Sequence, residues 1–364
     1  MSPPAPPAAL THSGEDTRVA PLAVRWADAA RQEGFHAWLG PLIEPFGLRL
    51  DTLKMASADA SFRRYLRISG SQHSFIIMDA PPGHEDLCAF VRVASWIEQA
   101  GLLGPRVLSH NTEQGFALLT DLGDELLLNV LQQASAERAQ TLMLQGLNTL
   151  VDWQRAMPTS MPGAWGAAEW LSELSLFETW CVQREFRHSW DAKQSAQWQQ
   201  VCGLLVQSAA AQSVVAVHRD WMPRNLMLCG TALGILDFQD AAPGPITYDV
   251  VSWLRDAFIS WEETQEIDWA VRYWQRARQA GLPVEQDFSE FWRQLEWMGL
   301  QRHLRILGVF CRLKHRDGKP QYVQDLPRFF GYATRVAMRY RALQPLLTLL
   351  EPLSGQSVQA SYTF

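Results

Sequence analysis

Three polar side chains, Asp220, Asn225 and Asp237, stand at short intervals after an apolar run over residues 214–217. A carboxylate can orient an attacking hydroxyl and accept its proton. An amide oxygen and a second carboxylate are hard ligands that suit magnesium. Phosphoryl transfer from a nucleotide needs both functions together. We therefore expect Asp220 to act as the base, and Asn225 and Asp237 to hold magnesium.

The spacing indicates how the chain brings these side chains together. Only four residues separate Asp220 from Asn225, so a tight loop lets both face one site. Two short apolar runs, 226–228 and 233–236, flank a glycine-containing turn and predict a hairpin. Such a hairpin returns Asp237 to the neighbourhood of Asn225.

The same segment matches the kinase catalytic-loop pattern H-R-D-x-x-x-x-N followed by a metal-binding aspartate. A second His-Arg-Asp, at residues 315–317, serves as an internal control. Tyr322 stands where the asparagine would be, and no strand pair or Asp-Phe follows. We interpret the second copy as a turn at a helix end and the first as a catalytic loop.

On these motifs the chain resembles the aminoglycoside phosphotransferase/choline kinase-like superfamily over about residues 45–340. HRDWMPRNLM, ILDFQDAAPGPITYDVVS and QRHLRILGVF are similar to the branch that phosphorylates the anomeric hydroxyl of N-acetylated amino sugars in bacterial cell-wall recycling. The resemblance implies the roles given above for Asp220, Asn225 and Asp237. It also implies that His218 and Asp249 support the catalytic loop, although an ordinary role at a helix start is an equal alternative for Asp249.

The helices and strands expected around these motifs divide the chain into two lobes. We predict an α+β, protein-kinase-like two-lobed fold with a small β-rich N-lobe over residues 21–120, which binds nucleotide. Residues 121–364 form a large helical C-lobe with the catalytic loop and the acceptor site. Residues 1–20, rich in proline and alanine, are expected to be a disordered tail. The expected helices cover about 23–38, 85–99, 135–157, 168–187, 191–212, 247–259, 264–280, 287–314 and 327–350.

The nucleotide side departs from the kinase pattern, because no lysine occurs between Lys54 and Lys193. The strand expected to carry the phosphate-binding lysine reads Phe-Ile-Ile-Met-Asp over residues 75–79. Arginine binds phosphate bidentately, so we hypothesise that Arg63 or Arg67 supplies the positive charge. An exposed basic edge strand is the alternative explanation for these arginines.

Other residues expected to bind ATP follow from position in the family pattern. A loop with Ser57 and Ser61 lies between two predicted strands, where a phosphate-covering loop belongs, although it contains no glycine. Thr120 and Leu122 stand at the connector between the lobes, where the adenine is expected. The cofactors implied are ATP and Mg²⁺.

The acceptor side gives less specific signals. Trp221 directly follows the base and could line a sugar pocket. Arg302 and His303 could meet a lactyl carboxylate, but a buried helix-packing histidine is an equal alternative. Three glutamates on one predicted helix could hydrogen-bond sugar hydroxyls, although a solvated acidic face is the commoner explanation: Glu169, Glu173 and Glu178.

Together these features predict a sugar kinase that uses ATP and magnesium to convert N-acetylmuramate or N-acetylglucosamine to the sugar 1-phosphate in peptidoglycan recycling. A kinase for an aminoglycoside, choline or homoserine is one alternative, but Arg302 and His303 argue against the acidic cleft that polycations require. A non-catalytic nucleotide-binding pseudokinase is another. The missing lysine favours it, whereas the complete set of Asp220, Asn225 and Asp237 weighs against it.

Composition narrows the partners and the compartment. The net charge of −6 provides no overall positive field for nucleic acid. Five scattered cysteines without a C-x-x-C pair predict reduced thiols instead of disulfides or a zinc site. The sequence shows neither a membrane-length apolar run nor the pattern of a secretory signal. We expect a cytoplasmic monomer with a small-molecule substrate.

Overall fold

The computed structural model describes residues 24, 26, 28–57, 63–83, 86–163 and 165–354. These residues form two compact units. The first comprises the described residues of Met1–Leu87 and of Val107–Asp121, and the second those of Cys88–Arg106 and of Leu122–Phe364. The segment 88–106 therefore packs with the second unit although it precedes residue 120. The tail expected over residues 1–20 lies outside the described residues.

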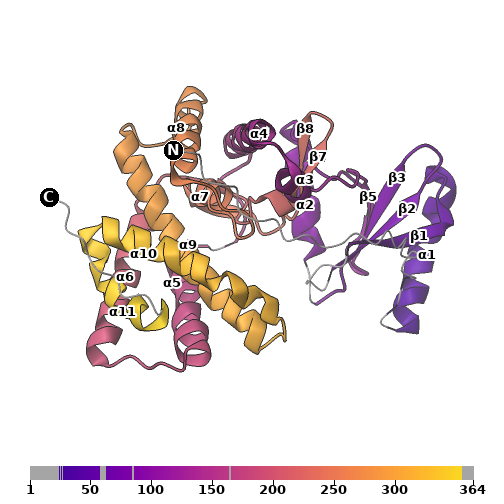
Figure 1. Cartoon of the computed structure of the whole chain (residues 1–364). Coiled ribbons are helices and arrows are strands. Elements are labelled where there is room, and N and C mark those ends of the chain that lie inside the picture. Colours follow the sequence, from indigo (N-terminus) through magenta and orange to yellow (C-terminus); the bar gives the residue numbers. More distant parts are fainter. Residues whose placement is uncertain are drawn as a thin grey trace, which may run out of the picture. The chain divides into compact units, whose positions relative to one another are not determined.

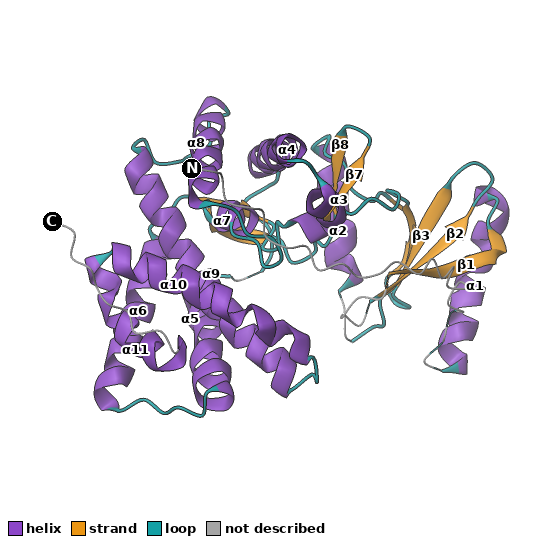
Figure 2. Ribbon diagram, viewed as in Figure 1, coloured by secondary structure: helices purple, strands orange, loops and turns teal. Residues whose placement is uncertain are grey.

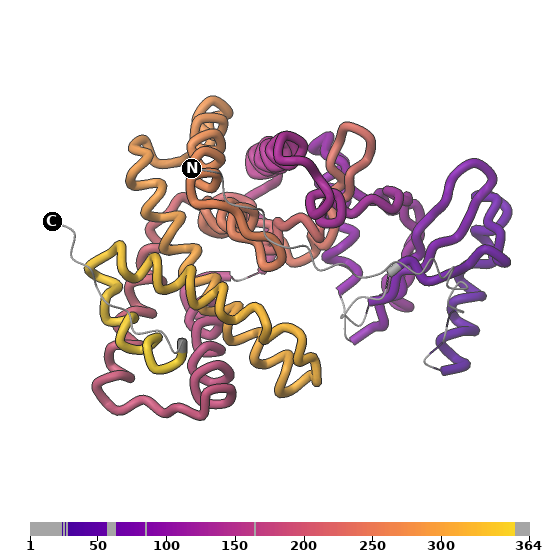
Figure 3. Tube along the Cα trace, in the orientation of Figure 1, coloured from indigo at the N-terminus to yellow at the C-terminus, as the bar shows by residue number. Residues whose placement is uncertain are grey.

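The first unit is built on an antiparallel sheet whose described strands run in the order β1-β2-β3-β5-β4 (Figure 1). Figure 3 shows how the chain leaves this sheet after β3 and returns to it with β4 and β5. The strands are β1 (Arg49–Ser57), β2 (Arg64–Ser69), β3 (Ser74–Asp79), β4 (Val107–Asn111) and β5 (Phe116–Thr120).

Helix α1 (Ala29–Phe46) covers one face of this sheet and buries Phe35 and Leu39 against it. The helix begins where the Asp28 side chain accepts a hydrogen bond from the backbone N–H of Arg31. It continues to Gly47, whose φ of 59° closes the last turn. The prediction that this helix ends near residue 38 is therefore wrong, because apolar contacts with the sheet extend the helix beyond Pro41.

The second unit is mainly helical, with two short strand pairs (Figure 2). This arrangement confirms the α+β class with a sheet-based N-terminal part and a helical C-terminal part. Its α-helices are α2 (Leu87–Gln99), α3 (Leu127–Gln133), α4 (Ala136–Ala156), α5 (Ala167–Leu176), α6 (Ala192–Ala210), α7 (Tyr248–Leu254), α8 (Glu263–Gln279), α9 (Phe288–His315), α10 (Leu326–Arg339) and α11 (Gln344–Ser354). A π-helix, η1 (Phe177–Glu185), and 3₁₀ turns η2 (Pro223–Asn225), η3 (Pro320–Asp325) and η4 (Arg341–Leu343) complete the helical elements described.

The strand pairs bracket the catalytic-loop sequence. β6 (Val214–Val217) pairs with β9 (Ala242–Pro245), and β7 (Leu226–Cys229) pairs with β8 (Ala232–Ile235). The β7–β8 pair confirms the predicted hairpin. The second His-Arg-Asp lies at the end of α9, as predicted: the helix ends at His315, and Arg316 is its C-cap residue.

Helix α9 packs against α5, η1, α7 and α10. The contact with α5 is unusually close at Gly308, where an added Cβ would lie 2.4 Å from the carbonyl carbon of Leu176. Leu176 is the last residue of α5 before the π-helix, so the helix expected over residues 168–187 changes its winding at this contact. The close approach brings the side chains of α5 and α9 together.

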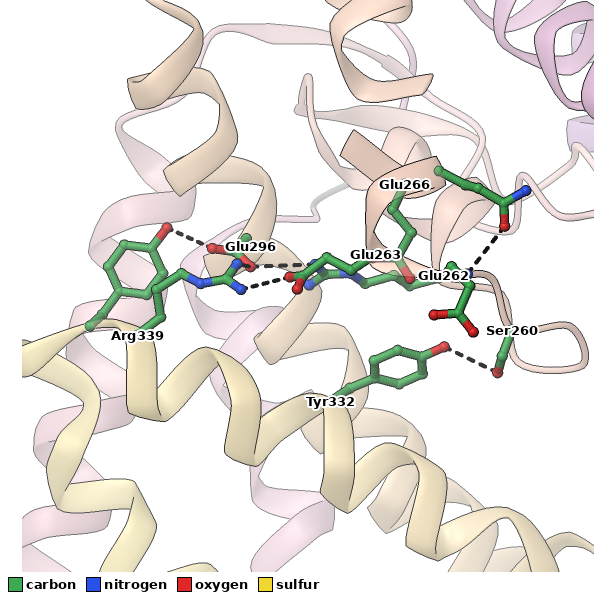
Figure 4. Close-up of polar contacts among 10 residues, drawn as sticks. Ser260, Glu262, Glu263, Glu266, Glu296, Tyr332 and Arg339 are labelled. Carbon is green, nitrogen blue, oxygen red and sulfur yellow. Dashed lines mark hydrogen bonds and ion pairs between the residues drawn. The ribbon is translucent and has the colours of Figure 1, made fainter. Parts of the chain in front are cut away.

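A buried ionic network joins α9 to α10 and to the end of α7 (Figure 4). Glu296 on α9 is fully buried and accepts hydrogen bonds from Arg339, Tyr340 and Arg255. Arg255 also donates to Glu266 on α8 at 2.9 Å. Each of these buried carboxylates has a guanidinium partner, as burial requires.

Two further expectations fail. The helix expected over residues 327–350 is interrupted at Tyr340, whose backbone is extended and whose hydroxyl donates to Glu296. The sequence also did not predict strand β9. Its sequence is Ala-Pro-Gly-Pro, and proline is tolerated in a strand only at an unpaired edge. Among the described residues, no helix has both the length and the apolarity needed to cross a membrane.

Candidate active site

The backbone of the proposed catalytic loop, residues 218–225, is held in an unusual conformation at the end of β6. Arg219 has a φ of 77°, which residues other than glycine rarely adopt. The carboxylate of Asp249, on α7, accepts hydrogen bonds from the backbone N–H groups of His218 (2.6 Å) and Arg219 (3.0 Å). This double contact stabilises the turn that presents Asp220, whose side chain is half-buried.

Burial changes the protonation of Asp249. Its side chain is inaccessible to solvent, and this burial raises the pKa of the carboxyl group to about 7, although the two backbone hydrogen bonds oppose the rise. The carboxyl therefore titrates near neutral pH while it supports the loop.

His218 joins the catalytic loop to the hairpin. The ring is buried between the indoles of Trp153 and Trp221, at centroid distances of 5.3 and 5.5 Å. Its Nε2 donates to the carbonyl of Leu236 at 2.9 Å. Burial lowers the pKa of His218 below its usual value, which favours the neutral ring.

The hairpin register brings Asn225 and Asp237 to the same end of β7 and β8. Leu226 pairs with Ile235 at that end of the two strands. The N–H of Leu236 donates to the carbonyl of Asn225 at 2.9 Å, and this backbone bond closes the hairpin beside the catalytic loop. Asp237 is the next residue, and it is exposed with a φ of 57°.

The residues present at this end of the hairpin fit a magnesium ion. The side-chain nitrogen of Asn225 donates to the carbonyl of Asp220 at 2.9 Å, so the amide oxygen is the atom available to a metal. Gln239 donates to one carboxylate oxygen of Asp237 at 3.0 Å. One amide oxygen and one carboxylate, completed by phosphate oxygens and water, suit magnesium. In the described part of the chain, no three His, Cys, Asp or Glu side chains gather into a metal site of their own.

A second charged group lies beside the catalytic loop and centres on Glu173 of α5. Its Oε1 accepts a hydrogen bond from the indole of Trp165 at 3.2 Å and lies 3.7 Å from Nη2 of Arg219. Its Oε2 lies 3.5 Å from Nε of Arg305 on α9. The sequence indicates Glu173 only as one of three glutamates, and Arg305 only as a member of the QRHLRILGVF stretch.

The other residues expected at the acceptor site have different surroundings. Trp221 and His303 are fully buried and Arg302 nearly so, and His303 stacks on Tyr332 at a centroid distance of 4.8 Å. Burial and the neighbouring arginines hold the pKa of His303 well below its usual value. These surroundings favour the packing alternative given for His303 and indicate a packing role for Trp221 and Arg302 as well. Glu178 lies on η1, where it accepts a hydrogen bond from Gln183 at 3.4 Å.

The first unit holds most of the residues expected to bind nucleotide. Arg67 on β2 forms two contacts with Asp121, from Nε at 2.6 Å and from Nη2 at 2.9 Å. Ser74 on β3 donates to the same carboxylate at 2.6 Å. The guanidinium group of Arg67 is therefore engaged by a carboxylate, with which a phosphate would have to compete.

The other expected nucleotide ligands are distributed as follows. Arg63 directly precedes β2, and Thr120 is the last residue of β5. Ser57 ends β1, but its side chain and all of Ser61 lie outside the described residues. Leu122 belongs to the second unit, and its carbonyl accepts a hydrogen bond from the thiol of Cys229 at 3.2 Å.

The family model and the curated relatives that match this chain are all phosphotransferases or kinases. A model of the phosphotransferase enzyme family matches residues 52–288. A protein of Neisseria meningitidis named N-acetylmuramate/N-acetylglucosamine kinase is 43% identical over 86% of this chain and 94% of its own. A protein of the same name from Pseudomonas aeruginosa is 44% identical over 82% of this chain and 87% of its own.

Solved structures extend the similarity to the fold. Choline kinase from Cryptosporidium parvum has a TM-score of 0.58 at 10% identity, over 87% of this chain and 99% of its own. The GDP complex of aminoglycoside 2′-phosphotransferase-IIIa has a TM-score of 0.58 at 14% identity, over 82% of this chain and 98% of its own. At these identities the likeness concerns the fold alone.

Proposed function

The chain belongs to the phosphotransferase enzyme family, and on this premise we propose that it is an ATP- and magnesium-dependent amino-sugar kinase. The acceptor is the anomeric hydroxyl of N-acetylmuramate or N-acetylglucosamine, and the product is the sugar 1-phosphate. The names of relatives that are 43% and 44% identical support this acceptor. Such a reaction serves the recycling of peptidoglycan sugars.

The observation that carries the proposal is the fixed position of Asp220. Asp249 holds the two residues before it, and Asn225 holds its carbonyl. Asp220 orients the anomeric hydroxyl and accepts its proton as the sugar oxygen bonds to the γ-phosphorus and the bond to the bridging oxygen of ATP breaks. An anomeric hydroxyl is more acidic than an ordinary alcohol, so proton transfer can come late.

We propose Asn225 and Asp237 as the residues that hold magnesium. The ion, when bound, neutralises charge on the phosphates during transfer. Gln239 takes the place of the glycine in Asp-Phe-Gly and orients the Asp237 carboxylate through its side-chain amide. His218 keeps the two halves of this arrangement together through its bond to Leu236.

On the nucleotide side, we propose that Arg67 or Arg63 binds phosphate. Ser57 and Ser61 are proposed as hydroxyl donors, and Thr120 and Leu122 as neighbours of the adenine. Arg67 has a defined orientation, because Asp121 accepts hydrogen bonds from its Nε and Nη2 and is itself held by Ser74, so a phosphate would have to share or displace this carboxylate. We propose a cytoplasmic monomer, since ATP is supplied there and the five cysteines are free thiols.

The proposal is tested by measuring ATP consumption with magnesium across N-acetylmuramate, N-acetylglucosamine, an aminoglycoside, choline and homoserine. Turnover with the two N-acetylated sugars is expected. Turnover with only one of the other acceptors would establish a different kinase. ATP binding without turnover on any acceptor would instead establish a pseudokinase.

A further inference from the structure

Helix α9 carries two arginines that differ in their access to solvent. Arg302 is 2% exposed and its guanidinium group lies 3.4 Å from the hydroxyl of Tyr248. Arg305 follows three residues later, and 25% of its side-chain surface is accessible. Arg305 is therefore the arginine of this stretch that a solute can reach.

Arg305 shares its carboxylate partner with another arginine. Arg219 and Arg305 both contact the carboxylate of Glu173, at 3.7 and 3.5 Å, so neither arginine has this glutamate to itself. Burial lowers the pKa of Arg305, but the neighbouring Tyr248 phenol and the carboxylates of Glu173 and Asp220 raise it overall. Because Arg219 directly precedes Asp220, the shared glutamate and Arg305 lie near the proposed base, where the acceptor sugar must place its anomeric hydroxyl.

The two sugars proposed as acceptors differ in charge. N-acetylmuramate carries a lactyl ether with a carboxylate on C3, and N-acetylglucosamine has a neutral hydroxyl there. An arginine bound loosely by a shared glutamate can turn to an incoming carboxylate and return to Glu173 in its absence. An arginine that is tightly paired with a carboxylate of its own would gain less free energy from binding the substrate carboxylate.

We infer that Arg305 binds the lactyl carboxylate of N-acetylmuramate and thereby sets the preference between the two sugars, with Glu173 positioning its guanidinium group. This assignment rests on the proposed function. It moves the recognition of the carboxylate from Arg302 and His303, which are buried, to a residue one turn further along the same helix.

The test compares Arg305→Gln, Arg305→Lys and wild type on N-acetylmuramate, N-acetylglucosamine and the neutral methyl ester of N-acetylmuramate. Removing a charged hydrogen bond should raise the KM for N-acetylmuramate about tenfold or more in Arg305→Gln, with less than about threefold change for the two neutral sugars. Arg305→Lys should recover part of the loss. Arg293→Gln, on the same helix but paired with Glu290, is the matched control and should change none of the three.

Equal effects on all three sugars, whether on KM or on kcat, would overturn the assignment, as would no effect on any. If Arg305→Gln does not fold, wild type decides: it should favour N-acetylmuramate over its methyl ester about tenfold, and equal use of both contradicts the inference. Failure of the proposed function gives a different result, because wild type then phosphorylates neither natural sugar.

Discussion

Asn225 donates a hydrogen bond from its side-chain nitrogen to the backbone carbonyl of Asp220, with 2.9 Å between nitrogen and oxygen. One side chain therefore contacts the proposed base residue and presents an oxygen to the proposed metal. The loop between them is short enough that a shift of either residue moves the other. This coupling explains why the chemistry depends on the spacing of the two residues as well as on their identity.

Replacing Asp249 by Asn should make the stability of the protein less dependent on pH. The folded-state pKa of Asp249 is raised to about 7, so between pH 4 and 7 the unfolded chain ionises while the folded chain keeps the proton. Wild-type stability should therefore fall with rising pH by about 1.4 kcal/mol per pH unit relative to Asp249→Asn, and level off above pH 7.

Urea unfolding of both proteins at several pH values between 4.5 and 8 measures this difference. If the free energies of unfolding of wild type and Asp249→Asn differ by the same amount at every pH, Asp249 does not titrate in this range. The activity of Asp249→Asn should also fall, because His218 and Arg219 donate to different carboxylate oxygens. The amide NH2 of asparagine would face one of these two N–H groups and could not accept its hydrogen bond.

Gly308→Ala should destabilise the fold by about 1–3 kcal/mol, because the added methyl group would overlap the backbone of Leu176 and force α5 away from α9. Sugar kinase activity should fall as well, since Glu173 and Arg305 lie on these two helices. Thermal unfolding measures the first effect and steady-state kinetics the second.

Gly331→Ala on α10 is the matched control for this substitution. Apart from the backbone of its own helix, no atom lies within 4 Å of the Cβ that it would add, and alanine is about 1 kcal/mol better than glycine in a helix. The control should be as stable as wild type or more so. Similar losses in both variants would show that close packing at Gly308 is not the cause.

Arg67→Ala should raise the KM for ATP about tenfold to a hundredfold, the usual effect of losing a charged hydrogen bond to phosphate. Arg64→Ala, on the same strand but bonded to Asp79, should leave this constant unchanged. An unchanged KM for ATP in Arg67→Ala, together with lower stability, would mean that Arg67 serves only to hold Asp121.

Local patterns explain what the sequence could predict. The β7–β8 hairpin and the loop before it are specified by short apolar runs and a turn, so Asn225 and Asp237 could be placed at one end of a hairpin without knowledge of the fold. The same kind of local context distinguishes the second His-Arg-Asp from the first.

The features that the sequence could not predict depend on long-range packing. Helix α9 is buried over most of its central part, so nothing in its sequence distinguishes the buried Arg302 from the accessible Arg305. The distinction depends on α5, which approaches at Gly308 and places Glu173 opposite Arg305. Strand β9 escapes prediction for a similar reason, because its prolines disfavour a strand and only its place as an edge strand beside β6 makes them tolerable.

The most direct test of the central claim follows the phosphate. Phosphorus NMR of wild type with ATP, magnesium and N-acetylmuramate should show a sugar 1-phosphate, identified by its coupling to the anomeric proton. Asp220→Asn, which keeps the size of the side chain but cannot accept the proton, should form it at least about a hundredfold more slowly while still binding ATP. A product phosphorylated at another hydroxyl, or an Asp220→Asn protein as active as wild type, would contradict the account.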